Sequence, residues 1–216
     1  TVDPCPYMSI IEMGASSSSC PDIWAVRIQW ELYRAKEEKD EVCLDKPLVQ
    51  LVGCLHGDET SGVHLAIRMI EECADLEHYP EWWALLQHVD VDIIPCLNPS
   101  GLAKRTRRNL AGRDLNRDFT LTASPYGGDH NPVQKETQLM MRHCIARPPL
   151  LCAHLHGGAT VVCFPYDWEQ GQPCNEHLLF QHLAQSWTAS WTTEQKRAFP
   201  PHGVIQAAEW YPVWGS

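Results

Sequence analysis

Residues 47–79 read PLVQLVGCLHGDETSGVHLAIRMIEECADLEHY, and this stretch decides the fold. Its first part, after Pro47, is a short and nearly continuous apolar run, which is typical of a central strand covered on both faces. Its last part, after Gly62, repeats apolar residues at helical spacing and contains no internal Pro. The stretch therefore predicts a strand, a turn that carries the letters HGDE, and a helix.

The same pattern recurs further along the chain. Val89–Leu97 predicts a second buried strand, Pro132 opens a helix that runs through Arg147, and Leu150–His156 predicts a third strand. Three further elements are expected: a strand at Asp22–Arg34 after the turn-like GASSSS, a strand at Val161–Phe164 and a helix at Asn175–Ser190. This order predicts an α/β fold, a mixed and mostly parallel central sheet with helices on both faces. A chain of 216 residues is expected to form one domain, residues 1–216.

Composition argues against two classes of partner. The formal net charge of -10 disfavours nucleic-acid binding, because that binding needs clustered Lys and Arg to replace counterions. No apolar run approaches the roughly 20 residues that span a bilayer, and the N-terminus lacks a basic stretch followed by an apolar core. We therefore expect neither a nucleic acid nor a membrane as partner, and the sequence leaves the oligomeric state open.

The chain contains ten cysteines, and several lie inside apolar runs, where a free cysteine behaves as a small hydrophobic residue. These are Cys54, Cys96, Cys152 and Cys163. Mostly buried thiols are expected, with one or two disulfides elsewhere as the alternative. No CxxC pair occurs, so zinc held by cysteine is not expected. The cysteine count favours a secreted or secretory-pathway protein, and a cytoplasmic one is the alternative.

Polar clusters follow the three buried strands at their carboxyl ends. HGDE follows the first strand, NPSG the second and HGG the third. Because ligands in open α/β sheets bind beyond these ends, we expect the functional site there. His56 and Glu59 stand three residues apart in HGDE, where a turn can direct both side chains at one point. By itself, this HxxE pair has a second interpretation, in which a surface His stands beside a solvated Glu.

A third metal ligand is expected from the strand that ends in HGG. Catalytic zinc commonly takes three protein ligands of the His and carboxylate type and leaves a fourth position to water. His156 can supply the third ligand, and His154 on the same strand is its competitor. His156 lies nearer the strand end and precedes two glycines that allow close approach. Similar ligands accept other divalent ions, so zinc is an inference from ligand type.

The segment RTRRNLAGRDLNRDF, residues 105–119, packs five arginines among Asn109, Asp114 and Asn116. It belongs to a long polar stretch, residues 98–131, that exceeds the usual length of a connection. Arg grips a planar carboxylate with two hydrogen bonds, and a neighbouring Asn can donate another. A basic pocket in an acidic protein predicts a bound carboxylate, and a solvated basic loop is the alternative.

Taken in order, HGDE, NPSG, RRNLAGRDLNRDF, LHGG with FPYD, and AAEWYPVWGS resemble the zinc metallocarboxypeptidase family, which includes the pancreatic and regulatory carboxypeptidases. These motifs extend over roughly residues 48–216. FPYD and the DLNR spelling look more like the regulatory, carboxypeptidase N/E-like subgroup, in which some members prefer C-terminal Lys or Arg. Asp167 is then a candidate for an acidic side-chain pocket, and pairing with a protein Arg is its alternative role.

The resemblance implies a zinc-dependent metallocarboxypeptidase, a hydrolase that releases C-terminal amino acids from peptides with a zinc-bound water as nucleophile. It implies one Zn²⁺ held by His56, Glu59 and His156. It also implies that the partners are the C-termini of peptides or proteins.

Two further roles follow from the same resemblance. Asn116 and Arg117 match the family's Asn-Arg pair, which grips the terminal carboxylate of the substrate. The family's RxN arginine polarises the scissile carbonyl and steadies its oxyanion. Arg107 is its best match, and Arg105 and Arg108 are the rivals.

One family element has no match. Family enzymes take their general base from a Glu downstream of the WYP region, and this chain ends at Ser216; Glu209 precedes WYP and is not given the role. We therefore expect a fragment of an active enzyme, incomplete at the C-terminal side of its fold and with little or no activity alone. A naturally short, inactive relative is the alternative. An N-acyl amino acid deacylase of related fold and a non-catalytic module that binds zinc and peptide C-termini are the competing functions.

Overall fold

The computed structural model describes residues 5–30, 46–119, 132–168, 170–171, 173–197 and 202–213. The chain divides into two compact units. The sheet unit consists of residues 1–115 and 133–157, and the second unit consists of residues 116–132 and 158–216. The predicted site motifs HGDE and NPSG therefore belong to the sheet unit, together with the HGG strand up to its first glycine.

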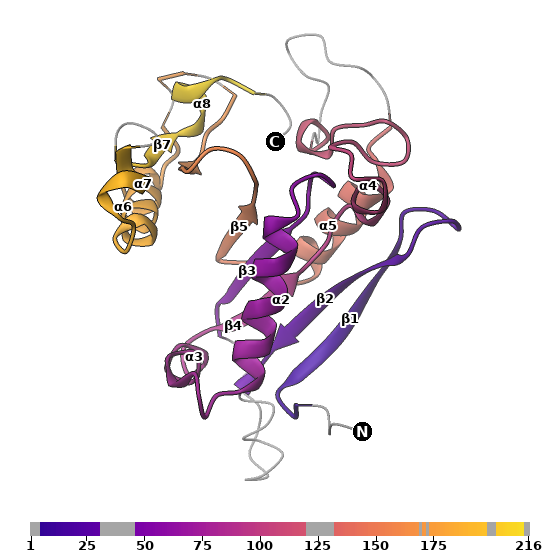
Figure 1. Ribbon diagram of the computed structural model, residues 1–216, viewed down its shortest axis with the longest axis horizontal. Coiled ribbons are helices and arrows are strands. Elements are labelled where there is room, and N and C mark those ends of the chain that lie inside the picture. Colours follow the sequence, from indigo (N-terminus) through magenta and orange to yellow (C-terminus); the bar gives the residue numbers. More distant parts are fainter. Residues whose placement is uncertain are drawn as a thin grey trace. The chain divides into compact units, whose positions relative to one another are not determined.

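The sheet unit is built on a five-stranded sheet in the order β1-β2-β4-β3-β5 among the described residues. The strands are β1 (Met8–Ala15), β2 (Asp22–Ile28), β3 (Leu48–Gly53), β4 (Asp90–Ile94) and β5 (Leu151–Leu155). β3 pairs in parallel with both β4 and β5, whereas β2 pairs antiparallel with β4 and with β1 (Figure 1). The predicted mixed sheet is thus confirmed, and its parallel part carries the three motif-bearing strands.

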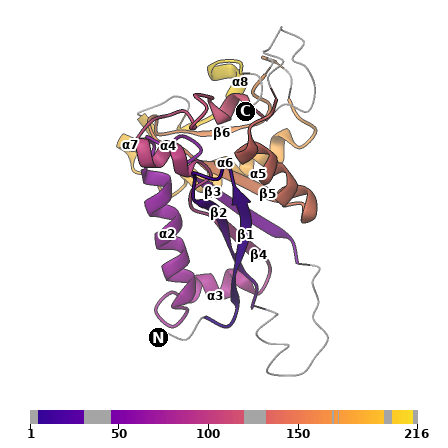
Figure 2. The ribbon, with the colours of Figure 1, turned by 90° about the vertical axis from the view of Figure 1, so that its right-hand side faces the viewer.

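Helices cover both faces of this sheet. They are α2 (Ser61–Ala74), α3 (Pro80–Leu86), α4 (Pro99–Lys104) and α5 (Lys135–Ala146). Figure 2 shows α2 on one side of the strands and α5 on the other. All five residues of β4 are buried, because both of its faces are covered. Apolar side chains from the strands pack with α2 into the main core, which includes Ile28, Leu51, Ala66 and Ile93.

Several expected boundaries differ from the observed ones. The strand expected at Asp22–Arg34 ends at Ile28, and residues 31–34 lie outside the described part of the chain. The helix that follows β3 ends at Ala74, before the turn that leads into α3. β1 was not expected at all. β1 is only partly buried, and its Ile10 is 72% exposed. Its sequence, MSIIEMGA, is interrupted by Ser9 and Glu12, so it lacks the continuous apolar run that identified the buried strands.

A charged cluster lies inside the sheet unit, away from the motif-bearing strand ends. The Asp92 side chain on β4 is fully buried and accepts two hydrogen bonds of 2.7 Å from the Arg27 guanidinium on β2. His143 Nε2 on α5 lies 2.8 Å from the same carboxylate. Burial alone would raise the pKa of Asp92, but hydrogen bonds from Arg27 and His143 hold it below its usual value.

Replacing Asp92 by Asn is expected to lower the free energy of unfolding by about 3 kcal/mol, because a partly buried Arg27 would lose its counter-charge. Urea denaturation measures the change. The control is Asp75→Asn, which removes an exposed pair with His78 and should leave the midpoint unchanged. An equal loss of unfolding free energy in the Asp92 and Asp75 variants would contradict the claim that the buried cluster stabilises the fold more than an exposed ion pair does.

The second unit has a small core of its own. Among its described residues, β6 (Val162–Phe164) and β7 (Val204–Gln206) form a parallel pair. Phe164 and Val204 pack with Ala184 and Phe180 of α6 (His177–Thr188). The remaining helices are the short α7 (Thr193–Arg197) and α8 (Ala207–Trp210).

Two motifs from distant parts of the sequence meet in this unit. The Tyr166 carbonyl of FPYD accepts a 3.2 Å hydrogen bond from the Ala208 amide, and the Asp167 carbonyl accepts one of 2.5 Å from the Val213 amide. FPYD is thereby joined by backbone hydrogen bonds to the segment AAEWYPV. The final WGS of the last motif lies outside the described residues.

All nine cysteines in the described part of the chain are free thiols, and Cys43 lies outside that part. Cys54, Cys73 and Cys174 are buried, whereas Cys152 and Cys163 are exposed. The expectation of free thiols is confirmed for these nine, but the expectation that most are buried is wrong, because three of them are buried and Cys152 and Cys163, both in apolar runs, are exposed. No helix of the described residues is long and apolar enough to cross a membrane.

Candidate metal centre

The HGDE motif forms a tight turn between β3 and α2. Cys54, the first residue after β3, adopts a left-handed backbone with φ of 52° and redirects the chain. His56 follows and is 1% exposed. The Glu59 amide donates a 3.2 Å hydrogen bond to the His56 carbonyl, which closes the turn and brings both side chains to one side. The predicted half-site is therefore formed by local backbone geometry.

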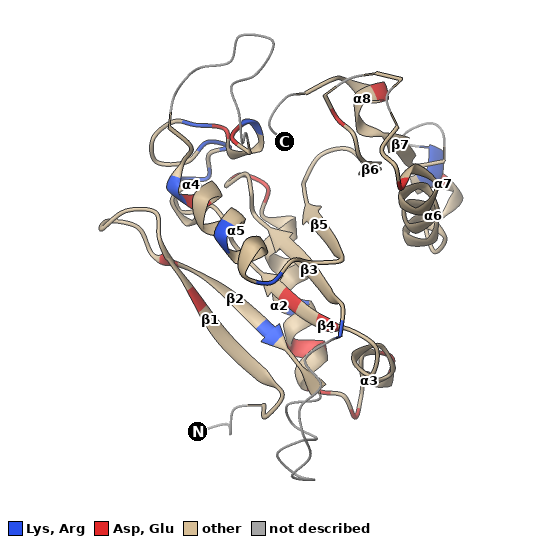
Figure 3. Cartoon of the chain, turned by 180° about the vertical axis from the view of Figure 1, so that it is seen from behind, with Lys and Arg blue, Asp and Glu red and all other residues tan. Residues whose placement is uncertain are grey.

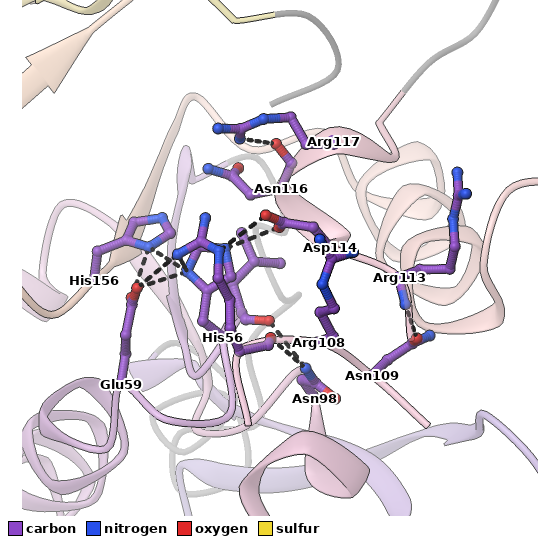
Figure 4. A network of polar contacts seen from close by, with 12 residues as sticks. His56, Glu59, Asn98, Arg108, Asn109, Arg113, Asp114, Asn116, Arg117 and His156 are labelled. Atoms are coloured by element: carbon purple, nitrogen blue, oxygen red, sulfur yellow. Dashed lines mark hydrogen bonds and ion pairs between the residues drawn. The ribbon is translucent and has the colours of Figure 1, made fainter. Parts of the chain in front are cut away.

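His56, Glu59 and His156 bring their ligand atoms together, all within 4.8 Å of one another. His56 Nδ1 lies 2.8 Å from Glu59 Oε1 and 3.2 Å from His156 Nδ1. His156 Nδ1 lies 2.9 Å from Glu59 Oε2. The ligand atoms of a tetrahedral zinc with bonds of about 2.0–2.1 Å stand about 3.3 Å apart, so the three side chains fit such an ion. Figure 4 shows them pointing toward one another.

The competing histidine of β5 does not join this group. The rings of His154 and His156 are 6.5 Å apart between centroids, and the grouped ligand atoms include His156 alone from this strand. Burial lowers the pKa of His154 to about 4. The Gly157 amide next to His156 donates a 2.9 Å hydrogen bond to Glu59 Oε2, which fixes the carboxylate beside the strand end.

Arg107 and Asp114 complete a ring of contacts around His56. Arg107 Nε donates to Asp114 Oδ2 at 2.9 Å, and its Nη1 lies 3.3 Å from Glu59 Oε1. Asp114 Oδ1 lies 3.1 Å from His56 Nε2, the ring nitrogen opposite the one that faces Glu59. A carboxylate in this position fixes the tautomer and orientation of a metal-binding His. Sequence reasoning gave Asp114 no role, although it stands two residues before Asn116.

The rival arginines have other positions in the structure. Arg105 is the left-handed C-cap of α4, and Arg108 Nη1 donates a 2.9 Å hydrogen bond to the Gly112 carbonyl. Figure 3 shows basic residues at α4 and along the loop that follows it, and others on β2, α5 and α7. Of the three arginines considered for the carbonyl-polarising role, Arg107 is the one that contacts the ligand cluster.

The NPSG motif ties the metal-binding turn to the arginine loop. Asn98 begins α4 as its N-cap, and its side-chain oxygen accepts a 2.9 Å hydrogen bond from the Gly101 amide. Its Nδ2 lies 3.3 Å from the Leu55 carbonyl and 3.4 Å from the Arg107 carbonyl. One buried amide thus connects the residue before His56 to Arg107, so NPSG has a positioning role.

Gly57 of HGDE and Gly101 of NPSG pack backbone to backbone. A Cβ atom at Gly57 would lie 1.9 Å from the Gly101 carbonyl carbon and 2.3 Å from the Leu102 amide nitrogen. Only glycine fits at a distance this short. The two motifs therefore require each other, because the turn that holds His56 is seated directly on α4.

Hydrogen bonds within the cluster stabilise the charged forms of its two carboxylates, Glu59 and Asp114. Burial alone would raise the pKa of Glu59, but hydrogen bonds from His156, His56 and the Gly157 amide hold it well below its usual range. Burial likewise opposes ionisation of Asp114, whose pKa is nevertheless low because His56 and Arg107 hydrogen-bond to it. Both carboxylates are therefore ionised at neutral pH. The ionised Glu59 and the two histidines form a donor set suited to a divalent cation, and the ionised Asp114 lies behind His56.

The comparisons with known proteins agree with this geometry. A family model described as zinc carboxypeptidase matches residues 5–216, nearly the whole chain. The chain belongs to the zinc carboxypeptidase family. Carboxypeptidase SOL1 of Arabidopsis thaliana is 31% identical over 176 residues, which cover 79% of this chain and 36% of that protein. Carboxypeptidase D of Anas platyrhynchos is 31% identical over 198 residues, which cover 79% of this chain and 14% of that protein.

This zinc carboxypeptidase chain thus spans about a third of SOL1 and about a seventh of carboxypeptidase D. The crystal structure of carboxypeptidase A from Helicoverpa armigera matches with a TM-score of 0.72 and 18% identity, covering 98% of this chain and 55% of that one. At this identity the structural match supports the fold alone. The fold expected from the motifs is therefore confirmed.

The pair assigned to carboxylate binding in the zinc carboxypeptidase chain lies at the start of the second unit. Leu115–Arg117 forms a short 3₁₀ helix, and Arg117 Nη1 donates a 2.5 Å hydrogen bond to the Asn116 carbonyl. Asn116 and Arg117 follow Asp114 closely in sequence, yet they fall in the unit that begins at residue 116. Their role in gripping a substrate carboxylate stays a prediction.

Zinc binding by this family member is expected to weaken as pH falls, with a midpoint above about 6.5, the ordinary pKa of His. Burial opposes protonation of His56, but hydrogen bonds to Asp114 and Glu59 raise its pKa. In the metal-free chain the protonated form thus adds stability below the ordinary value, and this stability is lost as pH rises through the raised one.

A pH series of zinc titrations with a competing chelator measures this midpoint. Asp114→Asn removes one of the contacts that raise the pKa of His56, so its midpoint should move to lower pH. A wild-type midpoint below pH 6, or an identical midpoint in both proteins, would show that the contacts around His56 do not control its protonation.

Proposed function

We propose that this protein is a zinc-dependent carboxypeptidase that removes C-terminal amino acids from peptides. The observation that carries the proposal is the meeting of His56, Glu59 and His156 at one point with the Arg107 guanidinium against them. Bound zinc in such a site would polarise the scissile carbonyl and lower the pKa of the attacking water. The family membership and the names of the relatives agree with this activity.

In this proposal, each residue of the site has a separate role. His56, Glu59 and His156 hold the ion, and Asp114 keeps the His56 ring oriented through Nε2. Arg107 is positioned by Asp114 and stabilises negative charge that develops on the scissile carbonyl oxygen. A guanidinium already fixed by a carboxylate reorganises little during the reaction.

Recognition of the substrate terminus is assigned to Asn116 and Arg117. Arg can hold a carboxylate through two parallel hydrogen bonds, and an adjacent Asn amide adds a third donor. A free C-terminal carboxylate is then the feature that distinguishes a substrate from an internal peptide bond. We accordingly propose that the natural partners are peptide or protein C-termini.

The test compares three compounds on the zinc-loaded protein: an acyl-capped dipeptide, the same dipeptide with an amidated C-terminus, and the matching N-acyl amino acid. Because the resemblance places the general-base Glu after Ser216, residues 1–216 are assayed beside a longer version of the chain that contains that Glu. We expect hydrolysis of the free-acid dipeptide by the longer version, and little or none of the amide.

Two outcomes would replace the proposal. Faster cleavage of the N-acyl amino acid than of the dipeptide would identify a deacylase. Tight binding of the free-acid dipeptide without hydrolysis by the longer version would identify a non-catalytic binding module. Arg117→Gln should weaken binding of the free-acid dipeptide and leave that of the amide unchanged, since its proposed partner is the carboxylate.

A further inference from the structure

Two thiols from different elements meet at one buried amide in the sheet unit. Cys144 on α5 and Cys152 on β5 both donate to the Gln50 side-chain oxygen, at 3.3 and 3.4 Å. Gln50 lies within β3 and pairs with Cys152 across the parallel ladder, so both side chains leave the sheet on the same face. The two sulfurs and the amide oxygen therefore converge between the sheet and α5.

The Gln50 amide is fully buried, and only its oxygen is used. Among the described residues, its Nε2 has no hydrogen-bond partner. The opposite orientation of the amide would place Nε2 against two S–H donors, so the oxygen faces the thiols. A buried amide nitrogen without a partner costs stability, and such a group in a native fold calls for an explanation. A role for the oxygen as a ligand atom provides one.

The separation of the two sulfurs suits a shared ion. Because both lie near one oxygen, they can be no farther apart than the sum of the two distances, 6.7 Å. An ion held between two sulfurs, with bonds of about 2.3 Å, requires them to lie within about 4.6 Å of each other. Cys152 is exposed, so its sulfur has room to turn about its one side-chain torsion toward Cys144. The same exposure gives an ion access from solvent.

The donor atoms select the kind of ion. Thiolate sulfur favours soft cations such as Cu⁺, whereas Mg²⁺ and Ca²⁺ prefer oxygen. Structural zinc takes four protein ligands, and three donor atoms of the described residues meet here, a low coordination number that Cu⁺ accepts. Burial and the nearby Asp92 carboxylate raise the pKa of the Cys144 thiol. This thiol is therefore protonated at neutral pH, and only a strongly thiophilic ion displaces its proton.

We propose that Cys144, Cys152 and Gln50 form a second metal site, selective for Cu⁺, that joins α5 to β5. Each sulfur binds the ion as a thiolate, the two thiol protons pass to solvent, and no electron is transferred. The Gln50 oxygen is a weaker third ligand. This site shares no residue with the cluster of His56, Glu59 and His156. Its ligands come from three separate elements, so the absence of a CxxC pair in the sequence does not exclude it.

The experiment titrates the fully reduced chain with Cu⁺ in the absence of oxygen, in competition with the Cu⁺ chelator bathocuproine disulfonate. Cys144→Ser and Cys152→Ser should each weaken the tightest Cu⁺ binding at least about tenfold. Because serine can donate the same hydrogen bond to Gln50, the fold should be retained, and circular dichroism checks it. The matched control is Cys163→Ser, a change at another exposed strand cysteine that belongs to the second unit, and its Cu⁺ affinity should equal that of the wild type.

Three results would overturn the inference: folded Cys144→Ser and Cys152→Ser chains bind Cu⁺ as tightly as the wild type, Cys163→Ser loses as much affinity as they do, or an equal concentration of Zn²⁺ displaces Cu⁺ from the thiols. His156→Gln should bind Cu⁺ as tightly as the wild type, because the two sites share no ligand. The proposed function is tested by zinc binding and hydrolysis, so its failure would leave the Cu⁺ result standing.

Discussion

Replacing His156 by Gln is expected to lower the zinc affinity of the chain more than a hundredfold, since changes behind a ligand alone cost about 10–100-fold. His156 Nδ1 lies 3.2 Å from His56 Nδ1 and 2.9 Å from Glu59, so its loss leaves a two-residue site. Its side chain is 34% exposed at the end of β5, so the fold should tolerate the change. Chelator competition measures the affinity, and circular dichroism confirms the fold.

The matched control is His154→Gln, two residues earlier on the same strand. His154 lies outside the group of converging ligand atoms, so we expect its zinc affinity to stay within about threefold of the wild type, well short of the loss of a ligand. A large loss in the His154 variant with none in the His156 variant would exchange the roles of the two residues.

Replacing Gly57 by Ala is expected to lower the free energy of unfolding by at least about 3 kcal/mol and to reduce zinc binding together with it. The added Cβ would lie 1.9 Å from the Gly101 carbonyl carbon. The contact is with backbone, so no side-chain rotation relieves it, and the HGDE turn must separate from α4. Urea denaturation and zinc titration measure the two effects.

Gly112→Ala serves as the comparison. Gly112 also lies in the arginine loop region, but nothing stands within 4 Å of an added Cβ there. Its φ of 73° costs an alanine about 1–2 kcal/mol, without disturbing the metal ligands. If Gly57→Ala lowered the free energy of unfolding and the zinc affinity as little as Gly112→Ala, the close packing of HGDE against NPSG would not be what positions His56.

The central part of the fold could be predicted because its signals are local. β3 and β4 are apolar runs buried by helices on both faces, and parallel pairing brings their carboxyl ends together with that of β5. β5 was also expected to be a buried strand, but its residues are only partly buried and Cys152 is exposed. Because the three carboxyl ends lie together, the clusters that follow them had to meet, as His56, Glu59 and His156 do. In this part of the chain, strand pattern and motif position were sufficient.

Other elements depended on tertiary contacts or on weaker signals. β1 is partly exposed and is defined by its pairing with β2, which no pattern within Met8–Ala15 reveals. α4 has only six residues, so it shows no helical period, although Asn98 followed by Pro99 is a readable N-terminus. Asp114 was missed because its role rests on a contact with His56, 58 residues away in sequence.

The division of the chain into two units also has no sequence signal that we identified. The boundary falls between Leu115 and Asn116, inside the motif DLNR. A continuous motif such as DLNR predicts that its four residues belong to one unit. In the structure, Asp114 and Leu115 belong to the sheet unit, and Asn116 and Arg117 belong to the second unit. The carboxylate-binding role of Asn116 and Arg117 therefore rests on the family pattern, whereas the metal cluster also rests on side-chain contacts in the structure.

The most direct test of the account is the zinc content of the purified chain, determined by elemental analysis after dialysis against metal-free buffer. We predict about one zinc per chain, the content of a single site with three protein ligands. A folded chain, shown by a cooperative urea transition, that retains no zinc even after incubation with zinc salt would contradict the claim that His56, Glu59 and His156 form a metal centre.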